Sequence, residues 1–191
     1  MRLTLKQFPS LIVITQTLTE EIIMGTIENL NNQDAIQKLK ELAESARVCM
    51  FCTDLDQQPI ASRPMSLKEV DEEGNLWFIS SADSNKNIEI QHNKYVQLFF
   101  SNTGPSEFLS IYGQAFIYTD RATIEDKWTP MANAWFDGKD DPNVTIIRVS
   151  PEDTKYWDTQ DGKMVTLLKI ATSTITGSKH SEGGVEGKLD V

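Results

Sequence analysis

Residues 47–67, with the sequence RVCMFCTDLDQQPIASRPMSL, decide the fold class. Two runs rich in apolar residues, 47–53 and 60–67, flank a polar turn at 54–59. Short runs of this kind about a turn are typical of two β-strands in a hairpin. Because a tight turn joins antiparallel neighbours, the segment predicts an antiparallel sheet.

The rest of the chain continues this pattern and adds helices. We expect further strands at 76–81, 95–101, 107–119 and 144–149. We expect helices at 34–46, 84–92 and 121–134, whereas 162–176 fits a helix or a strand because its later half is β-branched. These elements predict an α+β fold, mainly β with helices, built on a six-stranded antiparallel barrel. Because a small barrel fills its interior with side chains, a ligand would lie outside it or between subunits.

The composition is that of an acidic protein with enough apolar residues for one domain. The 191 residues are 39% hydrophobic, which suffices to bury a single core. The net charge of −10 argues against nucleic acid as a partner, because neutralising phosphates requires clustered Lys and Arg. No apolar run approaches the length that spans a bilayer, so we predict a cytoplasmic protein without a membrane partner.

The two ends of the chain differ in composition from the middle. We expect residues 1–31 to be an N-terminal extension, with Met24 as a candidate true start. A signal peptide is the alternative, although Pro9 interrupts its apolar run and no small-residue cleavage site follows. The domain itself is expected over 32–176, and the Gly- and Ser-rich residues 177–191 are expected to form a disordered tail.

The only two cysteines, Cys49 and Cys52, form a C-x-x-C pattern. On the predicted strand a separation of three places their side chains on opposite faces, whereas a redox pair requires a turn or a helix start. We therefore predict two free thiols in the core, which fits a reducing compartment. Because only His92 and His180 are available as further soft ligands, we predict no metal site.

Residues 128–142, WTPMANAWFDGKDDP, concentrate aromatic side chains beside a polar turn. Trp128 and Trp135 provide two of the four tryptophans of the chain. Such apolar area with an N–H donor favours a flat aromatic ligand or a subunit interface. We expect Trp157, in contrast, to lie in the core.

A second group of residues has the chemistry of an anion site. Arg63 lies near the end of the second predicted strand, and Ser84 lies at the N-cap of the helix that carries Lys86. Free N–H groups at a helix start favour an anion, and both cations can form charge-assisted hydrogen bonds with a phosphate. Taken singly, each residue is better explained by a plain role: an N-cap for Ser84, a solvated helix residue for Lys86 and a surface ion pair for Arg63. The combination of these residues with the segment that contains Trp128 and Trp135 is what favours a site. Ile88 is expected on the inner face of the helix.

Several short motifs together resemble a known family. Ser62-Arg-Pro-Met65, Leu76-Trp-Phe-Ile-Ser80, Ser84-Asn-Lys86 and Asn93-Lys-Tyr-Val96 resemble the FMN-binding split barrel of the pyridoxamine 5′-phosphate oxidase-like superfamily. The later motifs Gly113-Gln-Ala115, Trp128-Thr-Pro130, Ala134-Trp-Phe136, Asp140-Asp-Pro142 and Tyr156-Trp-Asp158 are similar to the bacterial general stress protein 26 group. Their order and spacing over residues 32–176 carry the resemblance.

The resemblance implies a homodimeric split barrel with FMN in grooves between the subunits. Arg63 and Lys86 match phosphate-binding positions, with Ser84 and Asn85 in the same loop. Trp128 or Trp135 would reach the groove from the other subunit, and dimer packing without flavin contact is the alternative for both. The strand backbones expected against the isoalloxazine and ribityl groups are those of Pro64, Met65, Ile79 and Ser80.

The implied function is that of an FMN-dependent oxidoreductase that passes hydride from NAD(P)H to an unknown acceptor. In pyridoxamine 5′-phosphate oxidases, C-terminal arginine and histidine residues hold the substrate phosphate. Here no Arg follows Arg148 and the only late histidine is His180, so this activity is not expected. The alternatives are a non-catalytic flavin-binding carrier or sensor, or the same fold with haem or a deazaflavin. Neither histidine is well placed as an acid or base, so no catalytic residue is predicted.

Overall fold

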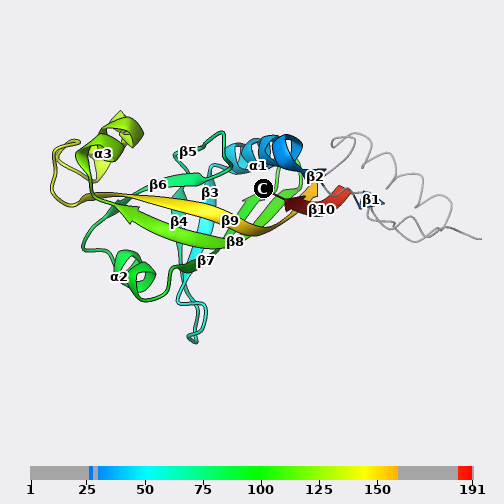
Figure 1. Cartoon of the computed structure of the whole chain (residues 1–191), viewed down its shortest axis with the longest axis horizontal. Helices are drawn as coiled ribbons and strands as arrows, with labels where there is room; N and C mark the ends of the chain where they lie inside the picture. Colours follow the sequence, from blue (N-terminus) through cyan, green and yellow to red (C-terminus); the bar gives the residue numbers. More distant parts are fainter. Residues whose placement is uncertain (1–25, 28–29, 159–184, 191) are drawn as a thin grey trace, which may run out of the picture.

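The computed structural model describes residues 26–27, 30–158 and 185–190, which form one curled sheet of ten strands with three α-helices around it (Figure 1). The strands are β1 (Thr26–Ile27), β2 (Leu30–Asn31), β3 (Val48–Thr53), β4 (Ala61–Ser66), β5 (Glu69–Val70), β6 (Leu76–Ser81), β7 (Tyr95–Asn102), β8 (Glu107–Tyr118), β9 (Val144–Asp158) and β10 (Val185–Asp190). The helices are α1 (Asn32–Ala46), α2 (Asn85–His92), α3 (Arg121–Lys127) and the 3₁₀-helix η1 (Pro130–Ala134).

The mainly-β, α+β prediction is confirmed, and the sheet is antiparallel apart from two short pairings. Its main path runs β1-β10-β9-β8-β7-β3-β4, and β6 pairs with β9. β10 pairs in parallel with β1 and β2, which are two residues long. The six expected strands are present, but β1, β2, β5 and β10 raise the number to ten. A two-residue strand is too short to leave a periodic pattern in the sequence.

The prediction of a disordered tail is wrong for Val185–Asp190. This segment forms β10 and pairs antiparallel with β9, and its Leu189 is buried beside Thr154. Ladder hydrogen bonds come from the backbone, so the sequence VEGKLD can supply them without a strand-like composition. The expectations for residues 1–25, 162–176 and 177–184 lie outside the described residues.

The sheet is open between β4 and β6. Within the described residues, β4 pairs only with β3, and β6 pairs with β5 and β9, although β4 and β6 run close together. Pro64 lies inside β4 and has no backbone N–H, which restricts such a strand to the edge of a sheet. The curled sheet is therefore a split barrel whose opening lies along β4.

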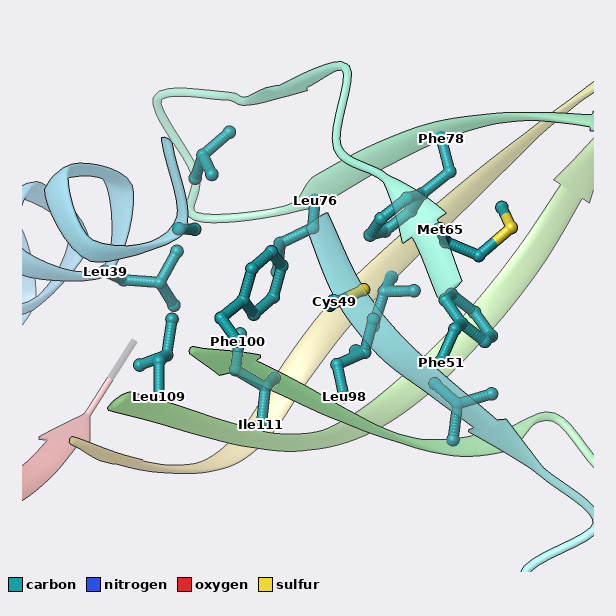
Figure 2. Close-up of a cluster of buried hydrophobic side chains, with 14 of the residues drawn as sticks. Leu39, Cys49, Phe51, Met65, Leu76, Phe78, Leu98, Phe100, Leu109 and Ile111 are labelled. Atoms are coloured by element: carbon teal, nitrogen blue, oxygen red, sulfur yellow. The ribbon is translucent and has the colours of Figure 1, made fainter. Parts of the chain in front are cut away.

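The core fills the interior of the curled sheet. Phe51 and Phe78 meet edge to face with ring centroids 5.3 Å apart, and Leu39 of α1 reaches toward Phe100 and Leu109 (Figure 2). Both cysteines are free and buried, as predicted. Burial raises the pKa of the Cys49 thiol far above its usual range, so this thiol is not a nucleophile.

Three expectations for the later elements are wrong. The helix expected over 121–134 is divided into α3 and η1, because the residue before Pro130 disfavours helical backbone. Trp157 is 40% exposed, and its neighbour Tyr156 is the core residue, since successive strand residues face opposite sides. On α2, Ile88 is 52% exposed, and the buried residues are Asn87 and Ile90.

In the part of the chain that the structure describes, no helix is long and apolar enough to cross a bilayer. The same residues contain no cluster of three or more His, Cys, Asp or Glu side chains arranged to hold a metal ion.

Candidate functional site

A cavity of about 710 Å³ lies at the opening of the split barrel, between β4, β6 and the segment around η1. Its volume lies within the range of roughly 300–1,000 Å³ that is usual for small-molecule and cofactor sites. Charged side chains enter from several sides: Lys68, Asp83, Lys86 and Asp141. The lining also contains residues expected from the sequence to bind a ligand: Pro64, Met65, Ile79, Ser80, Lys86 and Trp135.

The two strands that face the opening supply its apolar walls. Pro64 and Met65 are successive residues of β4, so they border the cavity along the edge of the strand. Ile79 and Ser80 do the same on β6. Neither strand has a ladder partner across this opening within the described residues, and a flat ligand can therefore lie against both edges.

A buried polar network fixes α2 beside the cavity. The Ser80 hydroxyl donates to Asn87 Oδ1 over 2.8 Å, and Asn87 Nδ2 donates to Thr145 Oγ1 over 2.9 Å. Ser84 occupies the N-cap position, but its hydroxyl donates to the Ser81 carbonyl over 2.7 Å and makes no capping bond. Asn87 was not predicted from the sequence as part of the site. The sequence signal for it would have been a polar residue on the face of the helix that packs against the sheet.

Lys86 is the half-buried cation of the cavity wall. Burial acts most strongly to lower the pKa of its ammonium group, and the charge of Arg63 adds to this effect. Asp83 and Glu89 act in the opposite direction. The charges of Arg63 and of two carboxylates therefore act on Lys86, and the phosphate-binding role expected for the two cations stays a prediction.

Arg63 does not line the cavity. Its Nη2 lies 2.7 Å from Glu89 Oε2, and its Nη1 donates to the hydroxyl of the buried Thr53. The Thr53 hydroxyl in turn donates to Glu89. Sequence analysis missed Glu89, although it lies three residues after Lys86 on one helix, where both side chains share a face.

The structure separates the two tryptophans that were expected near a ligand. Trp135 lines the cavity and is 71% exposed, next to the equally exposed Met131. Trp128 is not part of the lining but packs against Phe136, which is, with ring centroids 6.4 Å apart. Ser84 and Asn85 also lie outside the lining, at the start of α2.

The loop after Trp135 is tied to the body of the protein. Asp141 accepts hydrogen bonds from the backbone N–H groups of Asn143 and Asp137, and these bonds lower the pKa of its carboxyl group. Lys139 Nζ lies 2.9 Å from Glu125 on α3. These contacts hold the rim of the cavity opposite the two strand edges.

Comparison with known proteins gives a consistent result. Residues 34–181, about three quarters of the chain, match the family model described as pyridoxamine 5′-phosphate oxidase like. The chain is 29% identical over 143 residues to general stress protein 26 of Bacillus subtilis, a match that covers 72% of this chain and 99% of the relative.

Solved structures with this architecture include two general stress proteins. A crystal structure of a protein assigned as general stress protein 26 from Jannaschia sp. CCS1 has a TM-score of 0.67 at 23% identity, covering 83% of this chain and 98% of that one. The general stress FMN/FAD binding protein from Xanthomonas citri has a TM-score of 0.57 at 27% identity, covering 66% of this chain and 90% of that one.

The family match confirms the resemblance read from the motifs, and the first of these structures supports the split-barrel fold. The chain belongs to the pyridoxamine 5′-phosphate oxidase-like family and, within it, is similar to the general stress protein 26 group.

Proposed function

We propose that this protein is a flavoprotein that binds FMN in the cavity between β4 and β6. The observation that carries the proposal is a cavity bordered by two strand edges, which contribute the apolar residues Pro64, Met65 and Ile79, together with the half-buried cation Lys86. A flavin mononucleotide has the matching chemistry, with a flat apolar ring at one end and a phosphate at the other. The name of the Xanthomonas citri relative, which describes FMN or FAD binding, supports the same ligand class.

Each group in the cavity has a role in this proposal. Lys86 would hold the phosphate, helped by the N–H groups at the start of α2 near Ser84 and Asn85. Pro64 and Met65 on one side, with Ile79 and Ser80 on the other, would border the ring and the ribityl chain. Trp135 would cover the mouth.

We further propose that the protein is an oxidoreductase that passes hydride from NAD(P)H to an acceptor. When bound, FMN supplies reversible hydride transfer, and the protein supplies binding, orientation and the electrostatic environment. The apolar residues of the walls would shield the ring from water, and the exposed side chains of Met131 and Trp135 would border the approach of a second molecule.

A non-catalytic flavin carrier or sensor is the second candidate. The titratable side chains of the cavity favour it. They are two lysines and two aspartates, and the described lining contains no histidine, cysteine or tyrosine. The described histidine, His92, lies at the end of α2 and outside this set. A reaction that needs protein-mediated proton transfer would therefore have few groups available.

We propose a homodimer as the working form. The face of the sheet opposite the core exposes Met50, Phe99, Phe108 and Trp157, each between 40% and 49% exposed. Met50 pairs with Phe99 across β3 and β7, and Phe108 pairs with Trp157 across β8 and β9. An apolar face that spans four strands supports contact with a second copy. The two free cysteines support a reducing, cytoplasmic location.

The test of the oxidoreductase proposal is anaerobic addition of NADH or NADPH to the FMN-loaded protein, followed by absorbance in the visible range. Bleaching faster than that of free FMN supports the oxidoreductase. Flavin that stays bound and oxidised supports the carrier or sensor. Protein that retains no flavin contradicts both.

A further inference from the structure

Glu89 is bound to Arg63, one of the two cations expected to recognise phosphate. Its carboxylate is 2.7 Å from Arg63 Nη2, and it accepts a second hydrogen bond from Thr53. The side chains of Arg63 and Glu89 are only 24% and 18% exposed, so water screens this pair incompletely. The charge of Arg63 is therefore already compensated by Glu89.

The same carboxylate acts on the second cation. Glu89 and Lys86 share a face of α2, and the charges of Glu89 and Asp83 both favour the protonated form of Lys86. The charges of Arg63, Asp83 and Glu89 thus all act on Lys86, which lines the cavity. Two cations are balanced by two carboxylates around this position before any ligand arrives.

We propose that Glu89 limits recognition of the flavin phosphate, so that the cavity distinguishes FMN only weakly from riboflavin, which lacks the phosphate. This inference rests on the proposed flavin site. A phosphate near Lys86 is attracted by the two cations but repelled by the two carboxylates, and like charges a few ångströms apart oppose each other strongly when partly buried. Glu89 is therefore an affinity-setting residue for the phosphorylated ligand alone.

The variant that isolates this effect is Glu89→Gln. Glutamine has the same shape and keeps an oxygen that can accept from Arg63 and Thr53, but it has no charge. Glu41→Gln is the matched control, because Glu41 is exposed on α1 and accepts a hydrogen bond from Gln37. Thermal melting of each variant confirms that it is folded.

The experiment measures Kd for FMN and for riboflavin by fluorescence titration of each protein. We expect the ratio of riboflavin Kd to FMN Kd to rise about tenfold in Glu89→Gln, with riboflavin Kd within about twofold of wild type. The control should leave the ratio unchanged. A ratio that stays the same or falls in Glu89→Gln would show that Glu89 does not oppose the phosphate, and would overturn the inference.

The double variant Arg63→Gln, Glu89→Gln gives a second test that leaves no unpaired charge. If the pair contributes no net attraction, the Kd ratio should stay within about threefold of wild type. A fall of tenfold or more would mean that Arg63 recognises phosphate despite Glu89.

If wild type binds neither flavin, the proposed function fails. In that case, wild type and Glu89→Gln are each titrated with inorganic phosphate, and binding is followed by phosphorus NMR. If Glu89 opposes the phosphate, phosphate should bind more tightly to Glu89→Gln than to wild type.

Discussion

Two cations, Lys86 and Arg63, differ in their surroundings. Lys86 is partly buried and lines the cavity, whereas Arg63 is bound to Glu89 and Thr53. The sequence motifs around Arg63 and Lys86 predicted a phosphate-binding role for both cations, and this role stays a prediction. The motifs did not predict Glu89, because an ion pair between a strand and a helix depends on tertiary packing rather than on local pattern.

Replacing Lys86 with Gln should weaken FMN binding by about 1.5–3 kcal/mol, the range for a hydrogen bond to a charged group. This corresponds to roughly ten- to hundredfold in Kd. Riboflavin binding should change little, because only the phosphate contact is lost. Isothermal titration with both flavins checks this expectation, with the exposed lysine Lys94→Gln as the control. Equal losses for both flavins would place the phosphate elsewhere.

Asp71 is the residue that stabilises the turn before β6. It accepts hydrogen bonds from Trp77 Nε1 over 2.8 Å and from the backbone N–H groups of Asn75 and Glu73. Partial burial acts to raise the pKa of its carboxyl group, but these hydrogen bonds outweigh it and hold the pKa below the ordinary value of 3.8. Trp77 in turn packs under Lys127, whose Nζ is 4.5 Å from the ring centroid.

Asp71→Ala should lower the free energy of unfolding by about 1–3 kcal/mol, because the buried Trp77 N–H loses its acceptor. The lowered pKa means that the ionised carboxylate contributes its full stabilisation above pH 3.8 and loses it as the pH falls through the folded value. Urea unfolding at neutral pH and near pH 3 should therefore show a smaller difference at the lower pH. Glu72→Ala, an exposed change in the same turn, is the control.

At the scale of elements, the position of α2 depends on the contacts of Asn87 with β6 and β9. Asn is unfavourable in the interior of a helix. Asn87 is accommodated there because it forms hydrogen bonds with Ser80 and Thr145. The hairpin of β3 and β4, helix α1 and strand β6 followed the sequence pattern closely, because their periodicity is local and uninterrupted. The break at Pro130 and strand β10 were not predicted. The break depends on a single proline, and β10 depends on backbone pairing with other strands.

Asn87→Leu should cost about 1–3 kcal/mol of unfolding free energy, because the buried hydroxyls of Ser80 and Thr145 lose their amide partner. It should also weaken FMN binding, since Lys86 precedes Asn87 on the helix. Chemical denaturation and FMN titration measure the two effects, with the exposed residue change Asn85→Ala as the comparison for stability. Wild-type stability in Asn87→Leu would contradict the structural role.

At the scale of the whole molecule, one curled sheet provides both the cavity and an exposed apolar face. Its inner face encloses the core, its open edge forms the cavity, and its outer face exposes large apolar side chains. The motifs predicted the family and the region of the cavity, because their spacing spans most of the chain. They could not place Trp128 and Trp135 relative to the cavity, because the turn of η1 decides which of the two points into it.

The outer face gives a prediction about assembly. Phe99→Glu should convert a dimer to a monomer, because a charge would be buried at the centre of the apolar face. Ile60→Glu is the matched control, since Ile60 is similarly exposed, at 52%, but lies in the turn between β3 and β4. Light scattering coupled to gel filtration gives the mass of each. A wild-type monomer, or a Phe99→Glu dimer, would contradict this assignment.

The most direct test of the central claim is gel filtration of the purified protein with equimolar FMN at micromolar concentration. The elution is followed by protein absorbance and by flavin absorbance together. We predict that flavin co-elutes with the protein in stoichiometric amount and that Lys86→Gln releases much of it. Flavin that elutes entirely at the position of free FMN would contradict the account, leaving a split barrel whose cavity has another ligand.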